Sequence, residues 1–325
     1  MNKQDGPTAW NQADLDASQH WRMTVPDNIA VVMAAEARRV AADGQPAETV
    51  NRERYRLPQG ARFFEAIHSE LEHGTGLVVV DGLPFAGLTY AEKVALTLGV
   101  SDHVGRVVPQ NYELQRVVDV RDDGVEYSHR SRGYRSNKPL PFHTDGAHLF
   151  TLTCLDVARE GGDTILVSAS SVYNALRHED PDSLEVLCRG FYHHRRGQHG
   201  PGEAPLSHDR IPVFTFHDGL LHCCYNRNPI EWAEREGVRL SPTERAALDA
   251  MDAVLARDTL QLRLALQPGE SAFINNFITL HSRTEYRDDD DHRRHLLRVW
   301  MTDPESRRDG MSLLQLYVPA DVLAG

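Results

Sequence analysis

The sequence predicts a mainly β fold with flanking helices, an α+β chain whose strands form a closed or double-sheet core. Short apolar runs separated by turn-forming stretches begin at about Val104, and helical patterns dominate the chain before that point. Helices first and many short strands afterwards fit a closed or two-layered β architecture better than a sheet in which strands alternate with helices. A chain of 325 residues can bury a substantial core of this kind.

The expected elements follow from apolar spacing and from the residues that end each pattern. Residues 1–25 are polar and are expected to form an N-terminal arm, and residues 26–325 are expected to form one domain. Apolar spacing with closing glycines indicates a helical part over 26–100, which contains helices at 26–44, 60–74 and 88–100 and a short buried strand at 76–84. The β core is expected over about 104–302, with strands at 107–120, 140–145, 149–157, 164–168 and 211–216.

One helix is expected to interrupt the strands, over residues 241–258. Its start signals are a serine N-cap at Ser241, a proline at the first helical position and a glutamate at the third. Residues 260–277 then alternate leucine with polar or small residues, turn at a Pro-Gly pair and continue as a second strand. Two stretches, 121–139 and 193–210, are too long for simple turns and are typical of functional lids or disordered segments. The histidines of the second stretch are expected to be solvated rather than to bind a metal.

Composition argues against several classes of protein. The formal net charge of −12 disfavours nucleic-acid binding, because neutralising phosphates needs a basic surface. No apolar run approaches the length of a membrane span, and the N-terminus lacks the apolar region of a secretory signal. The four cysteines form no C-x-x-C pair and are expected to be free thiols. We therefore expect a cytoplasmic protein with no nucleic-acid or membrane partner; a homo-oligomer is compatible with the sequence.

The most informative motif is His143-Thr144-Asp145, together with a distant histidine, His281, in an apolar segment that we expect to be a strand. In an extended strand, residues i and i+2 point to the same face, so His143 and Asp145 can bind one metal ion while Thr144 points away. Two histidines and one carboxylate leave open positions on a non-haem ferrous ion, as oxygenases require. The same side chains could also hold Zn²⁺ in a hydrolase.

Four motifs, in this order and spacing, carry a resemblance to a known family. They are H-T-D at 143–145, G-G-D-T at 161–164, H-S-R at 281–283 and R-H-L-L-R at 294–298. Over roughly residues 75–302, the chain resembles the taurine dioxygenase/TfdA-type (clavaminate synthase-like) Fe(II)/2-oxoglutarate oxygenases. The resemblance implies that the expected strands form a double-stranded β-helix, or jelly-roll, core.

The resemblance also implies roles for individual side chains. His143, Asp145 and His281 would bind Fe(II). Arg294 would clamp the distal carboxylate of 2-oxoglutarate, which a planar guanidinium can meet with two hydrogen bonds. Thr164 would donate a hydroxyl hydrogen bond to the same carboxylate. No residue beyond the metal ligands is assigned a catalytic role.

Other predicted site residues have alternatives that the sequence leaves open. Arg293 is the alternative clamp for 2-oxoglutarate, because the register through the preceding acidic run is uncertain. Arg298 faces the same side of its strand as Arg294 and is expected to hold an anionic group of the substrate, or to be a structural ion-pair partner. Asn111 and Tyr225 are candidate substrate contacts, and structural roles in a turn and a strand are equally open for them.

The reaction implied by the resemblance is that of a 2-oxoglutarate-dependent dioxygenase. Such an enzyme most simply hydroxylates an unactivated C–H bond and releases succinate and carbon dioxide. A small polar or anionic molecule is expected as the substrate, either amino-acid-derived or a secondary-metabolite precursor. Desaturation, cyclisation and C–X cleavage are alternative outcomes, whereas Asp145 argues against halogenation, because halogenating relatives have a small residue there. A zinc-type hydrolase and a non-catalytic ligand-binding jelly roll are the alternatives from other classes.

Overall fold

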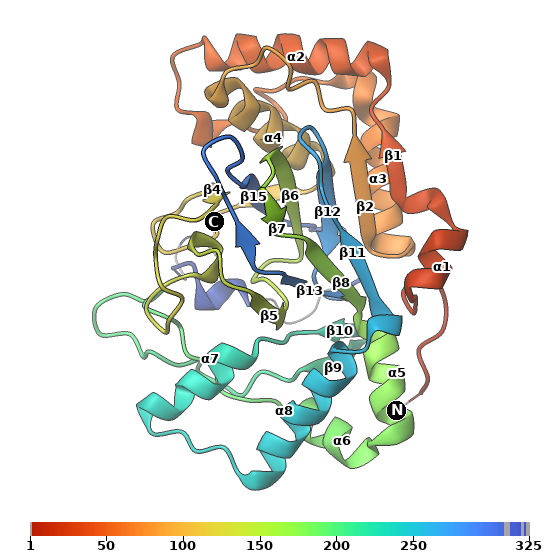
Figure 1. The fold of residues 1–325 in the computed structure, drawn as a ribbon, viewed down its shortest axis with the longest axis vertical. Helices are drawn as coiled ribbons and strands as arrows, with labels where there is room; N and C mark the ends of the chain where they lie inside the picture. Colours follow the sequence, from red (N-terminus) through yellow and green to blue (C-terminus); the bar gives the residue numbers. More distant parts are fainter. Residues whose placement is uncertain (1, 309–312, 320–321, 323–325) are drawn as a thin grey trace.

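Two β-sheets form the centre of the computed structural model, which describes residues 2–308, 313–319 and 322 (Figure 1). The larger sheet has the order β1-β2-β12-β6-β15-β3, with β4 also paired to β15. Its strands are β1 (Arg22–Thr24), β2 (Leu77–Asp81), β12 (Ser271–Asn275), β6 (Leu149–Asp156), β15 (His295–Thr302), β3 (Arg106–Val108) and β4 (Val117–Val120). The smaller sheet consists, in order, of β11 (Gln261–Leu264), β8 (Thr164–Ser168), β13 (Thr279–Arg283) and β5 (Leu140–His143).

Two short ribbons and a set of helices complete the chain. The ribbons pair β7 (Glu160–Gly161) with β14 (Tyr286–Arg287) and β9 (Phe214–His217) with β10 (Leu220–Cys223). The short 3₁₀ helices are η1 (Gln19–Trp21), η2 (Ala47–Thr49), η3 (Pro58–Gly60), η4 (Gly133–Arg135), η5 (Ala233–Glu236), η6 (Asp258–Leu260) and η7 (Leu314–Leu316). Mixed sheets flanked by helices confirm the predicted α+β class.

Strand β2 shows how the apolar pattern builds two cores at once. Leu77 and Val79 pack into the core between the two sheets, together with Leu166 of the smaller sheet. Val78 and Val80 point the other way and pack against the N-terminal helices. Because successive side chains of a strand point to opposite faces, both faces of β2 are buried. This explains why β2 is an uninterrupted apolar run in the sequence.

Three predicted helices cover the outer face of the larger sheet (Figure 1). They are α2 (Asp27–Ala41), α3 (Ala61–His73) and α4 (Tyr90–Val104). Helix α4 begins at a capping box in which the Thr89 hydroxyl accepts a hydrogen bond from the backbone N–H of Glu92 and the Glu92 carboxylate accepts one from the backbone N–H of Thr89. The apolar faces of these helices bury the outward-pointing residues of the sheet, so the sheet is covered on both sides.

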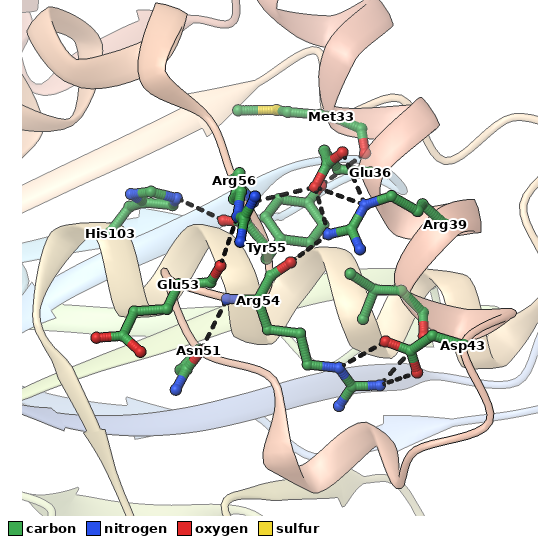
Figure 2. Close-up of polar contacts among 11 residues, drawn as sticks. Met33, Glu36, Arg39, Asp43, Asn51, Glu53, Arg54, Tyr55, Arg56 and His103 are labelled. Carbon is green, nitrogen blue, oxygen red and sulfur yellow. Dashed lines mark hydrogen bonds and ion pairs between the residues drawn. The ribbon is translucent and has the colours of Figure 1, made fainter.

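Polar contacts hold the segment after α2 between α2 and α4 (Figure 2). The hydroxyl of Tyr55 donates a hydrogen bond of 2.6 Å to the carbonyl oxygen of Met33 in α2. The carbonyl oxygen of Tyr55 lies 2.8 Å from Nε2 of His103 in α4. Arg54 forms an ion pair of 2.5 Å with Asp43, which lies just after the end of α2. These contacts join the N-terminal helices into one layer.

The N-terminal residues differ from the expected polar arm. Trp10, Leu15 and Trp21 are buried in the core between the sheets, and α1 (Gln12–Ala17) carries the second of them. Strand β1 then adds to the larger sheet in parallel with β2. A few large apolar side chains anchor the segment, although its average composition is polar. The division into an arm and one domain stays a prediction.

Four helices pack below the sheets in Figure 1, where one was predicted. They are α5 (Ala169–Glu179), α6 (Pro181–Arg189), α7 (Arg227–Trp232) and α8 (Pro242–Leu255). Helix α8 begins at Ser241 with the predicted capping box. The sequence analysis missed α5 and α6, although Ser168 and Asp180 cap them as N-cap residues and a proline opens α6. These helices share a separate apolar cluster with α8.

The two strands expected within residues 260–277 are present, but they belong to different sheets. Strand β11 pairs with β8, whereas β12 pairs with β2 and β6. The turn at Pro268 therefore carries the chain from one sheet to the other. Among the residues that the structure describes, no helix is both long and apolar enough to span a membrane.

Candidate metal centre

The three predicted metal ligands lie together where β5 pairs with β13. His143 and His281 are register partners, and their ring centroids are 4.2 Å apart. Asp145 follows β5, and its Oδ2 lies 4.0 Å from Nε2 of His281. One ligand atom from each of the three residues lies within 4.8 Å of the others. This spacing suits a divalent ion with bonds of about 2 Å, so these residues fit the Fe(II) expected from the sequence.

The charge states of these residues also suit a metal ion. Burial lowers the pKa of His143, and burial together with the neighbouring His143 lowers the pKa of His281 well below its ordinary value. Burial alone would raise the pKa of Asp145, but Arg298 and the two histidines hold it well below its usual range. Metal binding requires neutral imidazoles and an ionised carboxylate. The three side chains therefore need no change of protonation at neutral pH.

Two side chains of β15 hold the carboxylate of Asp145 from the opposite sheet. Nη1 of Arg298 donates hydrogen bonds to both carboxylate oxygens, at 3.1 and 2.9 Å. Nε1 of Trp300 donates to Oδ2 at 3.0 Å. Arg298 is itself held by Gln110, whose side chain accepts from its Nε at 3.0 Å and donates to its carbonyl oxygen at 2.7 Å. Arg298 thus has the ligand carboxylate as its partner, and its predicted contact with substrate stays a prediction.

Replacing Trp300 with phenylalanine should weaken Fe(II) binding about tenfold, because outer partners of metal ligands typically contribute about 10- to 100-fold to metal affinity. The change removes one donor to Asp145 and keeps an aromatic ring in the core. Fe(II) titration under anaerobic conditions measures the effect. Trp21→Phe is the matched control, since its buried indole donates to the carbonyl oxygen of Leu15 far from the ligands. Equal Fe(II) affinity in the Trp300 variant and the wild type would contradict this role.

The predicted 2-oxoglutarate residues line a cavity next to the ligands. This cavity is bordered by Thr164, Arg294, His143 and His281. Thr164 and Arg294 are 3% and 4% exposed. Nη1 of Arg294 is buried and has no hydrogen-bond partner in the described part of the chain. A buried guanidinium with a free donor suits a carboxylate ligand, so these residues fit 2-oxoglutarate.

The G-G-D-T motif lets Arg294 approach the backbone. Nε of Arg294 donates to the carbonyl oxygen of Gly162 at 3.1 Å. Gly162 has φ of +80°, and a Cβ there would lie 2.6 Å from Cδ of Arg294, so only glycine fits without strain. Arg293, the alternative clamp, points away: its side chain is 74% exposed, 3.9 Å from Asp290. Arg294 is therefore the arginine that faces the cavity.

Asn111 and Tyr225, the tentative substrate residues, do not line the cavity that contains Thr164 and Arg294. They also do not line a second cavity, which His143 and Asp145 border. Asn111 closes a turn, where its Oδ1 accepts from the backbone of Gln115 at 3.0 Å. Tyr225 is fully buried, and its hydroxyl donates to Asp252 at 2.6 Å. Its carbonyl oxygen accepts from the backbone N–H of Thr144 at 2.8 Å, so it supports the ligand motif indirectly. The next residue, Asn226, does line a cavity and forms a bridge to His143.

The 193–210 loop is more ordered than the prediction of solvated histidines allowed. His193 and His194 are 1% and 6% exposed. His194 forms an isolated β-bridge with Leu206, and the backbone N–H of His193 donates to the hydroxyl of Ser207 at 3.0 Å. The loop folds back on itself, and this backbone pairing buries the histidines. The expectation of a solvated loop was wrong at these positions.

One further positioning residue was missed by the sequence analysis. Oδ1 of Asn276 accepts a hydrogen bond from the backbone N–H of Asp145 at 3.0 Å, and its Nδ2 donates to the carbonyl oxygen of Ala147 at 2.8 Å. These contacts fix the turn that carries the ligand carboxylate. The available signal was an Asn-Asn pair inside an otherwise apolar strand segment, because a buried amide needs polar partners.

Comparisons with known proteins agree with this site. The model of the "Taurine catabolism dioxygenase TauD, TfdA family" matches residues 44–300. "FR-33289 synthase" of Streptomyces rubellomurinus is 31% identical over 316 residues, which cover 95% of this chain and 93% of that protein. An asparagine oxygenase solved with Fe(II), 2S,3S-3-hydroxyasparagine and succinate has a TM-score of 0.67 at 18% identity, covering 87% of this chain and 94% of that one. The non-haem iron oxygenase OrfP, solved with Fe and α-ketoglutaric acid, has a TM-score of 0.62 at 17% identity, covering 86% and 93%.

The chain belongs to the TauD/TfdA family of dioxygenases. The solved oxygenases share its fold, which confirms the predicted jelly-roll core. The protein is accordingly an oxidoreductase, a 2-oxoglutarate-dependent dioxygenase. The cofactors expected for this class are Fe(II) and 2-oxoglutarate, and the residues described above fit both.

Proposed function

We propose that this dioxygenase hydroxylates a small molecule that carries an anionic group, using His143, Asp145 and His281 to hold Fe(II). The supporting observation is that two of these ligands share one cavity with Thr164 and the inward-facing Arg294. Bound iron and 2-oxoglutarate would supply the oxidant for an unactivated C–H bond, with release of succinate and carbon dioxide. The chain itself supplies binding, orientation and exclusion of water.

Each part of the chain has a separate task in this proposal. The Arg294 guanidinium and the Thr164 hydroxyl bind the distal carboxylate of 2-oxoglutarate and so orient its other end toward the metal ligands. Arg298 keeps the carboxylate of Asp145 ionised and in place. The 121–139 loop contributes Tyr134 to the cavity wall, where it limits access of water. Desaturation, cyclisation and C–X cleavage would use the same residues, and product analysis distinguishes them.

An anaerobic titration tests the function. Fe(II) together with 2-oxoglutarate should give a weak visible charge-transfer band that neither component gives alone. Small metabolites, amino-acid derivatives among them, are then screened for oxygen-dependent release of succinate. A zinc-type hydrolase would show no band and would turn over without oxygen. A non-catalytic binding protein would release no succinate with any candidate. Absence of both the band and the succinate would contradict the oxygenase function.

The partners and location form part of the same proposal. A small-molecule substrate is supported by the solved oxygenases, one of which holds 2S,3S-3-hydroxyasparagine. Cytoplasmic location is supported by the four cysteines, which are thiols and of which three are buried. The acidic net charge supports the absence of a nucleic-acid partner.

A further inference from the structure

A second cavity beside the metal ligands is lined by three arginines from separate parts of the chain. It is bordered by two of the ligands, His143 and Asp145. Arg132 comes from the 121–139 loop, Arg196 from the 193–210 loop and Arg298 from β15. Both long loops that the sequence singled out therefore bring a cationic side chain to the position where substrate would meet the metal.

This cavity has more positive charge than its own residues neutralise. Among the described residues that line it, Asp145 is the only acidic one, and Arg298 donates to both of its oxygens. Arg132 and Arg196 are left without a carboxylate partner in the cavity wall. Burial, and after it the nearby Arg196 and Arg298, lower the pKa of Arg132 to about 10, so its guanidinium is still charged at neutral pH. Charges that are buried without a counter-ion are costly.

The three guanidiniums also have unfilled hydrogen-bond donors. Nη1 of Arg132, Nε of Arg196 and Nη2 of Arg298 are buried and have no hydrogen-bond partner among the residues that the structure describes. Arg196 and Arg298 are each 6% exposed, whereas Arg132 is half-buried at the cavity wall. Buried donors are almost always satisfied in native structures. Three unfilled donors around one cavity therefore indicate a ligand with several acceptor oxygens.

The arginines of the loops are held in place rather than free to swing into solvent. Nη2 of Arg196 donates to the hydroxyl of Tyr317 at 2.7 Å. The guanidinium of Arg132 lies over the ring of the same tyrosine, 4.7 Å from its centroid. Arg196 has φ of +55°, a left-handed conformation that is uncommon outside glycine and is found at functional sites. The backbone is thus bent to direct this side chain inward.

We infer that the substrate carries a phosphate-monoester or phosphonate group, a tetrahedral dianion that Arg132 and Arg196 bind beside the metal ligands. This inference rests on the proposed oxygenase function and narrows its substrate class. A carboxylate or sulfonate has one negative charge and would leave one of the two guanidiniums uncompensated. A phospho group has up to two charges and three acceptor oxygens, which match two planar guanidinium forks. Arg298 is already paired with Asp145 and completes the wall.

Binding of small probes tests this inference without turnover. The protein is loaded anaerobically with Fe(II) and 2-oxoglutarate, and methyl phosphate, methylphosphonate, methanesulfonate and acetate are titrated by calorimetry. We expect the two phospho probes to bind at least about tenfold more tightly than the two monoanions. A preference between methyl phosphate and methylphosphonate identifies which linkage the site takes. Methyl phosphate affinity should also rise about fourfold from about pH 5.5 to about pH 7.5, because its second pKa is near 6. Methanesulfonate affinity should not rise with it.

Variants of the two loop arginines assign the effect to these residues. Arg132→Gln and Arg196→Gln should each weaken methyl phosphate binding about 30-fold or more, as expected for removing one partner of a buried charged pair. Arg132→Lys and Arg196→Lys should recover part of the affinity, because they restore the charge but not the planar fork. Arg130→Gln is the matched control, since Arg130 lies in the same loop as Arg132 and is exposed. It should bind methyl phosphate like the wild type.

The outcomes separate this inference from the proposed function. An unchanged charge-transfer band in each variant shows that the fold and the metal site are intact. A normal band with equal affinity for methyl phosphate and acetate would overturn the inference while the oxygenase function stands. Unchanged methyl phosphate affinity in both glutamine variants would overturn it as well. Absence of the band in the wild type would instead contradict the function itself.

Discussion

Replacing His281 with alanine should abolish the Fe(II)/2-oxoglutarate charge-transfer band and all succinate release. The side chain supplies one of three ligands clustered in the described residues and comes from β13, whereas His143 ends β5 and Asp145 follows it. A site reduced to His143 and Asp145 cannot hold the ion in a fixed geometry. Fe(II) affinity should therefore fall by more than about 100-fold, which is the upper end of the loss typical for residues that only contact a metal ligand. Anaerobic Fe(II) titration and succinate assays measure both effects.

The matched control for this variant is His222→Ala. His222 is also a buried histidine, 1% exposed, and stacks on Phe277 with ring centroids 5.0 Å apart. Its loss should lower thermal stability by a similar amount, because either change leaves a cavity in a packed region. The band should persist in this control. If the His281 variant folds and keeps the band, the assignment of the ligands is wrong.

Replacing Arg294 with alanine should raise the KM for 2-oxoglutarate about 30-fold or more, because the change removes a buried cation opposite a carboxylate. The buried free donor of Arg294 and its contact with Gly162 direct it into the cavity. The metal ligands are untouched, so the rate at saturating 2-oxoglutarate should change much less than KM. Succinate release measured against 2-oxoglutarate concentration separates the two parameters.

The neighbouring arginine provides the control for this second variant. Arg293→Ala makes the same chemical change one residue earlier, on a side chain that is 74% exposed. Its KM for 2-oxoglutarate should equal that of the wild type. The reverse result, a raised KM in the Arg293 variant alone, would show that the strand register at this turn differs from the one described here.

The sequence was informative where one local rule determines the outcome. The H-x-D spacing predicted that His143 and Asp145 lie together, as they do although β5 ends at His143, and capping residues predicted the start of α8. It was weak where a contact depends on which neighbouring residue points inward. Tyr225 was predicted as a substrate contact, yet the adjacent Asn226 is the residue that lines a cavity, because neighbouring side chains point in opposite directions.

Contacts between the sheets lay beyond the reach of sequence reasoning. The side chain of Trp300 meets Asp145 only when the two sheets pack together, and Gln110 holds Arg298 from the segment after the neighbouring strand β3. The spacing of residues along the chain does not predict a contact between side chains that are distant in sequence. The helices α5 and α6 are a different case, because their caps were visible in the sequence but were outweighed by the expectation of continuous β structure.

The hydrogen bonds from Arg298 and Trp300 of β15 to Asp145 link metal binding to the completion of folding. The ligand motif follows a strand of the smaller sheet, but the groups that orient and ionise its carboxylate belong to the larger one. A chain whose sheets have formed but not yet docked would possess all three ligands and still lack a competent centre. Iron uptake should therefore report on the last stage of assembly, and iron should stabilise the docked state by an amount that rises with the logarithm of the Fe(II) concentration above its Kd.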